Sequence, residues 1–382
     1  MTRYLLGDLV RNCKEKVDRD NNPYEYFVAG DHMETERPRL TMRGRFDEAD
    51  VGPAFIRLFR PGQVLYGSRR TYLKKVSVAD FEGVTSNVTF VLETKDEEVL
   101  PQRLLPFLLL SDRFTSYSIG KSKGSTNPYV LFSDLADFEV DLPVPVRVAE
   151  IADVMCAAEQ VKENYRSLLA ACDDVVKSQF VEIFSKKEFP LIPLSQACTK
   201  ITDGTHKTPQ YQETGIAFIS AKNVTSDGKL DFSDIKHIST DEYESIQKRC
   251  ETQIGDVLLT KSGSLGMPAI VDVDFPIGLF ESLAVLKYRR DILDGVFLRE
   301  QLKSARVQDQ FTGGVKGIAV KHLHLNVIGR TSIIVPPLEL QEEFTDFVLQ
   351  VDKSKFAVQK ALDELNATTK KILNQELGLG DV

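Results

Sequence analysis

The stretch TSIIVPPLELQEEF, Thr331 to Phe344, joins a β-branched apolar run to a segment with helical spacing, and two prolines stand at the junction. Proline suits a helix entrance because the N–H it lacks has no partner in the first turn. The acidic residues that follow favour the positive end of the helix dipole. We therefore expect a strand that leads directly into a long helix. An earlier stretch, DFEVDLPVPVRVAEIADVM at Asp137 to Met155, has nearly the same order of features.

These two stretches belong to a longer internal repeat. Gly62 in RPGQVLYGS lies 193 residues before Gly255 in QIGDVLLTKSGS, and GKSKGST at Gly120 falls on GGVKGIA at Gly313. A period this long indicates duplicated domains, and 382 residues exceed what one core usually holds. We predict globular domains at residues 1–145 and 186–337, followed by helices at 146–185 and 338–378.

The segments after the prolines show a heptad pattern. Apolar residues recur every seven positions from Phe344, and the earlier segment follows the same frame. The predicted helix–helix interface consists of Ile151, Val154, Val161, Leu168 and Val175 on the first helix and Phe344, Phe347, Val351, Val358, Leu365 and Ile372 on the second. The alternative is two unrelated amphipathic helices, each packed on its own domain.

The expected fold class is α/β (α+β), because each globular block has short β-rich runs separated by polar loops. Connectivity makes the helix pair antiparallel: one helix leaves the first block toward the second, and its copy should run back. The predicted architecture is a dumbbell with pseudo-two-fold symmetry, in which two similar globular domains are separated by two long antiparallel coiled-coil helices.

Composition is that of an ordinary globular chain, with 42% hydrophobic and 27% charged residues. No signal peptide and no apolar stretch of about 20 residues is found. Five irregularly spaced cysteines without a C-x-x-C pair favour a reduced cytoplasmic protein without structural zinc. The net charge is −8. Most of it lies in segments 151–185 and 338–382, so the globular blocks are nearly neutral and can carry basic patches.

Basic loops occur at matching points of the two blocks. Lysine and arginine among glycine, serine and threonine suit phosphate contacts, and arginine, asparagine and histidine can reach base edges. The residues predicted to bind DNA are Arg43, Arg45, Arg69, Arg70, Lys74, Lys75, Lys121 and Lys123 in the first block and His206, Lys207, Lys261, Ser262, Ser264, Lys316 and Lys321 in the second. A solvated turn is the competing interpretation of each loop.

Signals for catalysis are weak. NNPYEY at Asn21 lacks the second proline of an amino-methyltransferase motif, and Asp80, Glu93 and Lys95 have nuclease-like spacing that the second half does not repeat. No phosphate-binding loop of the G-x-x-x-x-G-K-S/T type occurs, and His322 and His324 lack a supporting cluster of metal ligands. A stand-alone DNA-modifying enzyme (methyltransferase or nuclease) and an acidic DNA-mimic inhibitor remain as alternatives.

Taken together, the chain resembles the specificity subunit of type I restriction–modification systems. The resemblance extends over essentially the whole chain. It is strongest in FPLIPLSQACTKITDGTHKTPQY, IGDVLLTKSGSLG, VKGIAVKHL and IIVPPLELQEEF, and P-P-L-x-x-Q is the most specific element. The first half departs more, with VDLPVPVRVAEIADVM at the helix entrance and no counterpart of DGTH.

The resemblance implies a non-catalytic DNA-binding subunit. Each globular block would be a target recognition domain that reads one half of a split, asymmetric site on double-stranded DNA. The helix pair would set the spacing and dock two methyltransferase subunits. S-adenosylmethionine, ATP and magnesium are expected on the methyltransferase and restriction (motor) subunits, and no cofactor, metal or membrane is expected for this chain.

Overall fold

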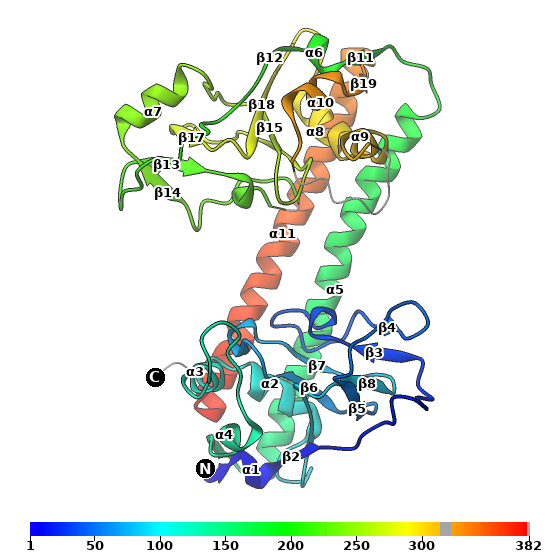
Figure 1. Ribbon diagram of the computed structural model, residues 1–382, viewed down its shortest axis with the longest axis vertical. Helices are drawn as coiled ribbons and strands as arrows, with labels where there is room; N and C mark the ends of the chain where they lie inside the picture. The colour runs from blue at the N-terminus through cyan, green and yellow to red at the C-terminus, as the bar shows by residue number, and fades with distance from the viewer. Residues whose placement is uncertain (226, 314–321, 380–382) are drawn as a thin grey trace. The chain divides into compact units, whose positions relative to one another are not determined.

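The computed structural model describes residues 1–225, 227–313 and 322–379 (Figure 1). The chain folds into two compact units. Unit 1 comprises Met1–Ser167 and Val358–Val382, and unit 2 comprises Leu168–Ala357. Both predicted long helices are present, as α5 (Pro145–Phe184) and α11 (Leu338–Leu377), and each contributes to both units.

The described part of unit 1 contains three sheets. The first has the strand order β2-β9-β6-β7, the second the order β4-β3-β8-β5, and β1 pairs antiparallel with β10. The strands are β1 (Thr2–Leu5), β2 (Val10–Cys13), β3 (Tyr26–Val28), β4 (Gly44–Arg45), β5 (Phe55–Phe59), β6 (Val64–Gly67), β7 (Val76–Val78), β8 (Gly83–Ser86), β9 (Thr89–Thr94) and β10 (Glu139–Leu142).

The described part of unit 2 repeats this arrangement. Its first sheet has the order β12-β18-β15-β16, its second the order β14-β13-β17, and β11 pairs antiparallel with β19. The strands are β11 (Leu191–Pro193), β12 (Cys198–Asp203), β13 (Ile216–Ile219), β14 (Lys236–Ile238), β15 (Val257–Thr260), β16 (Pro268–Ile270), β17 (Ile277–Leu279), β18 (Leu283–Tyr288) and β19 (Ser332–Ile334).

The predicted similarity of the two globular blocks is confirmed by details of their topology. Each second sheet contains one parallel pair, β3 with β8 and β13 with β17. The turn before β6 contains Gly62 at φ 87°, and the turn before β15 contains Gly255 at φ 86°. A positive φ favours glycine because it has no Cβ. The same turn is thus built by the same residue type at the repeat distance.

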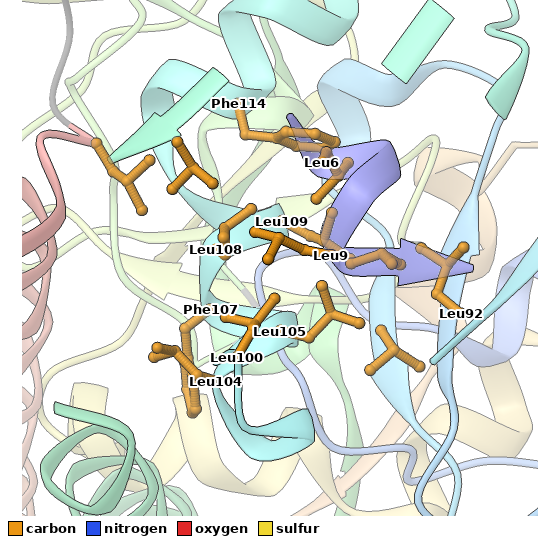
Figure 2. Packing of buried hydrophobic residues seen from close by; sticks show 14 of the residues in the cluster. Leu6, Leu9, Leu92, Leu100, Leu104, Leu105, Phe107, Leu108, Leu109 and Phe114 are labelled. Carbon is orange, nitrogen blue, oxygen red and sulfur yellow. The ribbon is translucent and has the colours of Figure 1, made fainter. Parts of the chain in front are cut away.

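The main core of unit 1 lies between its first sheet and short helices (Figure 2). Leu6 and Leu9 from the first short helix pack with Leu92 of β9 and with the apolar run that ends in Phe114. Residues of α5 and of the end of α11 belong to the same core. The short helices of unit 1 are α1 (Leu6–Leu9), α2 (Leu105–Leu110), α3 (Asp112–Gly120) and α4 (Phe132–Ala136).

Aromatic side chains join the long helices to the core of unit 2. The Phe184 ring of α5 lies 4.9 Å from that of Phe297 and 5.5 Å from that of Phe344 on α11, centre to centre. Edge-to-face contacts of this kind add to the stability gained from burial. The other helices are α6 (Leu194–Ala197), α7 (Thr240–Gln247), α8 (Gly295–Lys303), α9 (Ala305–Phe311) and α10 (Leu325–Arg330).

The structure explains the strand–proline–helix junction from which the repeat was recognised. Gln341, in the first turn of α11, is completely buried. Its side-chain amide donates to the carbonyls of Ile292 (2.9 Å) and Pro336 (2.8 Å) and accepts from the Asp294 N–H (2.9 Å). A buried amide in P-P-L-x-x-Q therefore ties the proline turn to the loop before α8.

A second buried glutamine fixes the strand that precedes the prolines. The Gln301 side chain on α8 accepts from the Ile334 N–H at 2.6 Å and donates to the Ile334 carbonyl at 3.1 Å. It satisfies both polar groups of one residue of β19, which would otherwise be unpaired at the sheet edge. The exit of β19 and the entrance of α11 are thus held by side chains.

The two long helices run antiparallel within each unit. In unit 1 the Arg147 guanidinium near the start of α5 pairs with Glu376 near the end of α11, at 2.6 Å. In unit 2 the Lys355 ammonium of α11 pairs with Asp173 of α5, also at 2.6 Å. This direction agrees with the prediction from connectivity.

The predicted interface residues are only partly correct. Ile151 and Phe344 are buried. The other five predicted residues of α11 are half-buried: Phe347, Val351, Val358, Leu365 and Ile372. The prediction was wrong for four residues of α5, whose exposed fractions are 48%, 40%, 47% and 49% for Val154, Val161, Leu168 and Val175.

The buried row of α5 lies one position further along the chain. Met155, Lys162 and Val176 are buried, each one residue after an exposed aliphatic residue. One residue rotates the face of a helix by about 100°. The error has a physical cause. The buried row includes Lys162, whose ammonium donates to the Thr369 hydroxyl at 2.8 Å. A prediction that counts only apolar residues therefore chooses the exposed row.

Candidate nucleic-acid interface

Two basic loops of unit 1 meet, although they are far apart in the sequence. The Val130 N–H donates to the Ser68 carbonyl at 2.9 Å, and the Arg70 N–H donates to the Pro128 carbonyl at 2.7 Å. Arg69 forms an isolated β-bridge with Tyr129. The loops SRRTYLKK and KSKGSTNPYV therefore form one surface, which we call the unit 1 loop pair (residues 68–75 and 121–130).

The unit 1 loop pair presents three exposed cations. Arg69, Arg70 and Lys121 are exposed, and none forms an ion pair with a carboxylate of the described residues. Two aromatic side chains beside them are also exposed, Tyr72 by 53% and Tyr129 by 39%. Unpaired cations suit phosphate contacts, and exposed rings offer apolar contact to bases or sugars.

The other predicted cations of this loop pair have partners within unit 1. Lys74 pairs with Glu36 and, at 3.1 Å, with Asp112. Burial lowers the pKa of Lys74, but the two carboxylates outweigh burial and raise it above its usual value. Lys123 pairs with Asp134 at 2.7 Å.

Lys75, Arg45 and Arg43 are placed differently again. Lys75 donates to the Gly30 carbonyl at 2.5 Å. Arg45 is surrounded by three carboxylates, those of Glu25, Asp47 and Glu48. Arg43 is exposed and lies over the Tyr26 ring at 3.9 Å from its centre. Arg45 would have to exchange its own partners for phosphate, whereas Arg43 would not.

Unit 2 repeats two of the backbone bonds that hold the loop after β6. The Leu323 N–H donates to the Lys261 carbonyl at 2.7 Å, at the positions that correspond to Val130 and Ser68. The Lys261 N–H donates to the Ser282 carbonyl at 2.7 Å, as the Ser68 N–H does to the Val88 carbonyl at 3.2 Å. The loop after β15 is thus equivalent in the two units.

The side chain at this equivalent position differs between the units, and the prediction for Lys261 was wrong. The Lys261 side chain is only 2% exposed. Its ammonium pairs with Asp203 and donates to the Glu281 carbonyl at 3.0 Å. A buried, paired ammonium has no access to a phosphate. In unit 1 the position is Ser68, whose hydroxyl donates to the Val88 carbonyl.

The carboxylate of Asp203 is the centre of a charged cluster. It pairs with Lys261 and Arg249, and His206 Nε2 lies 3.3 Å from its Oδ2. Burial raises the pKa of Asp203, but the hydrogen bond and charge of Lys261, with the charges of Arg249 and His206, outweigh it and hold the pKa below its usual value. Asp203 is therefore ionised near neutral pH.

The remaining predicted residues of unit 2 lie around this cluster or outside the description. His206 and Lys207 are exposed, Ser262 is half-buried and Ser264 is exposed. Lys316 and Lys321 lie outside the described residues. His206 Nδ1 is 3.6 Å from Glu281, and His322 Nε2 is 4.0 Å from the same carboxylate. Across residues 1–225, 227–313 and 322–379, no group of histidine, cysteine and acidic side chains is arranged to hold a metal ion.

Two curated relatives share parts of this sequence. The chain is 28% identical over 163 residues to the type I restriction enzyme EcoBI specificity subunit of Escherichia coli, across 42% of this chain and 34% of that subunit. It is 22% identical over 183 residues to the EcoDI specificity subunit of the same organism, across 47% of this chain and 39% of that subunit. The matches thus span little more than a third of these relatives. No protein-family model matches the chain.

Solved structures extend the likeness to the whole chain. The S subunit of a type I restriction–modification system from M. genitalium gives a TM-score of 0.52 at 15% identity, over 100% of this chain and 96% of that one. The chain has the fold of a type I specificity subunit. A chain from a structure of type I R-M complex assembly and conformational transition gives 0.51 at 18% identity, over 98% and 97% of the two chains.

Within this specificity-subunit fold, sequence reasoning missed two residues of the cluster in unit 2. Asp203 stands in the D-G-T-H stretch that carried the resemblance, but only its neighbours His206 and Lys207 were selected because they are basic. Arg249 stands in no motif; its guanidinium reaches Asp203 from the segment after α7. The motif was a usable signal for Asp203, and none existed for Arg249.

None of the helices in the described part of the chain combines the length and the apolarity that crossing a bilayer requires.

Proposed function

We propose that this chain is the sequence-specific DNA-recognition subunit of a type I restriction–modification complex, in which each unit reads one half of a bipartite, asymmetric site. The observation that carries the proposal is the duplicated loop after β6 and β15. Two units of similar topology hold this loop through two equivalent backbone bonds, but with different side chains. Two similar, non-identical readers suit a site with two different halves.

The chemistry of the loop pairs supports contact with double-stranded DNA. Arg69 and Arg70 in unit 1 and Lys207 in unit 2 are exposed and form no ion pair with the described carboxylates. Such cations can release counterions from phosphates, and arginine can also bind guanine in the major groove through two hydrogen bonds. The net negative charge does not oppose this, because most of it lies on the segments of the two long helices.

The long helices are proposed to set the spacing between half-sites and to dock two methyltransferase subunits. Val154, Val161, Leu168 and Val175 are exposed and occur every seventh residue of α5, a spacing that aligns side chains along one helix face. Exposed aliphatic residues in a row are typical of protein interfaces. S-adenosylmethionine, ATP and magnesium would be bound by the methyltransferase and restriction subunits.

The structure gives no support to the alternative of nuclease activity at Asp80, Glu93 and Lys95. The Glu93 carboxylate is held by Arg11 (2.6 Å) and Gln63 (2.9 Å), and Lys95 donates to the Gly7 carbonyl. A catalytic carboxylate needs access to a metal ion or a water molecule. The exposed, unpaired Arg69 and Arg70 likewise argue against an acidic mimic of DNA.

A domain exchange tests the proposal. Residues 1–145 are replaced by the equivalent block of a relative with a different target, and the hybrid is assembled with methyltransferase subunits. Mapping of methylated bases by sequencing should show a new first half-site and an unchanged second one. A change in both half-sites of the hybrid would contradict independent reading by the two units. If the unmodified complex methylates DNA at sites that are not bipartite, the proposed function would be contradicted.

A further inference from the structure

The D-G-T-H stretch of unit 2 is built as a rigid loop that presents two side chains. Gly204 approaches the Leu279 carbonyl so closely that a Cβ would lie 2.1 Å from its oxygen. The Thr205 N–H donates to that carbonyl at 2.9 Å, and the Thr205 hydroxyl accepts from the Lys207 N–H at 3.2 Å. These contacts leave His206 and Lys207 exposed at the end of the loop.

The buried ion pair anchors this loop to the two other loops of the cluster. Asp203 and Lys261 are each 2% exposed. The ammonium of Lys261 binds the Asp203 carboxylate and the Glu281 carbonyl, while its backbone binds Ser282 and Leu323. One residue therefore connects the end of β12, the turn before β18 and the segment before α10.

Comparison with unit 1 shows that the backbone bonds at this position can form without a lysine. Ser68 makes the equivalent backbone bonds to Val88 and Val130, and unit 1 has no counterpart of D-G-T-H. The lysine therefore occurs in unit 2, which has the D-G-T-H loop beginning at Asp203, and unit 1, which has no such loop, has serine at the equivalent position. A buried ion pair is weak evidence for stability, and in some proteins it fixes a specific geometry instead.

We propose that the Asp203–Lys261 pair is a positioning device that holds His206 and Lys207 against the half-site read by unit 2. Lys261 is a positioning residue and does not contact DNA, whereas Lys207 does. This inference rests on the proposed function in DNA recognition. It replaces the sequence-based interpretation of Lys261 as a phosphate contact.

Two lysines of the same cluster provide a matched comparison. K207M and K261M are each assembled with methyltransferase subunits, and binding is measured against salt concentration on DNA with correct or altered half-sites. K207M should lower the salt slope by about 0.9, as one lost phosphate contact does. K261M should leave the slope unchanged on DNA with an altered second half-site, because Lys207 is still present and a phosphate contact does not depend on sequence. It should reduce the preference for the correct second half-site about 10-fold or more, the size of a mismatched base pair, with the first half-site unaffected.

The double variant D203N/K261M separates positioning from stability. It removes both buried charges at similar volume, so its Tm should stay close to that of the wild type. Its preference for the second half-site should nevertheless be lost, and the Thr205 amide should exchange hydrogen faster.

Three results would overturn the inference. The first is a salt slope for K261M on DNA with an altered second half-site that falls as it does for K207M. The second is an equal loss of preference at both half-sites in the double variant. The third is a full preference for the correct second half-site in that variant. A wild-type complex without preference for either half-site would instead refute the proposed function.

Discussion

Gln341→Met tests the junction between strand and helix that defines this repeat. The substitution removes the buried amide and keeps nearly the same volume, so cavity effects should be small. It leaves the Asp294 N–H and the carbonyls of Ile292 and Pro336 without the partners they have in the structure. The start of α11 and the loop before α8 would then be joined by apolar packing and by the hydrogen bond from Thr345 to Asp294.

The expected loss follows from these three bonds. A buried group that loses its hydrogen-bond partner costs about 1–3 kcal/mol. Three such groups, partly relieved by relaxation of the loop, predict a decrease of about 3–5 kcal/mol in the unfolding free energy of unit 2. In a domain of about 150–250 residues, 1 kcal/mol shifts the Tm by about 2–4 °C. We therefore expect a decrease in Tm of about 6–20 °C.

The assay combines circular dichroism with hydrogen exchange. The chain contains no tryptophan, so thermal unfolding is followed at a helix wavelength instead of by fluorescence. Hydrogen exchange resolved by peptide then assigns the destabilised transition, which should include β19 and α8 and spare β6 and β9 of unit 1.

Gln359→Met is the matched control on the same helix. Gln359 is exposed, and its amide donates only to Asp363 one turn away, at 2.9 Å. This change should alter stability by less than about 0.5 kcal/mol. A Tm for Gln341→Met within about 2 °C of the wild type would refute the reasoning, because the buried amide would then not hold the junction.

Three further results are expected. Burial raises the pKa of Glu163, but hydrogen bonds from Arg37 and Arg166 outweigh it and hold the pKa below its usual value. The stability that this carboxylate adds is therefore present at neutral pH and lost as pH falls below about 4. In urea titrations at pH 7 and at about pH 3, E163Q should lose less stability on acidification than the wild type. R69A should weaken DNA binding and lower the salt slope by about 0.9, whereas R3A, which removes a cation already paired with Asp141, should leave the slope unchanged. The purified chain without other subunits should neither bind S-adenosylmethionine in calorimetry nor methylate DNA; robust methylation by the chain alone would contradict a non-catalytic role.

The sequence by itself was sufficient to recognise the duplication, the two long helices and the loops that form the candidate interface. These features depend on local or periodic signals. Gly62 and Gly255 reveal one turn because only glycine adopts that φ without strain. The proline pair before α11 suits a helix entrance, where the missing N–H has no partner to lose. The antiparallel direction of the helices followed from connectivity.

The tertiary structure decided which side chains of these elements are buried and which are free. Val154 is exposed and Met155 is buried, because the interface of α5 also buries polar residues that a count of apolar positions ignores. Lys207 is exposed while Lys261 is buried, although both stand in loops of similar composition. The difference lies in Asp203, a partner distant in sequence. Burial and pairing depend on such distant contacts, so only the folded chain separates a lysine that can meet a phosphate from one that holds a loop in place.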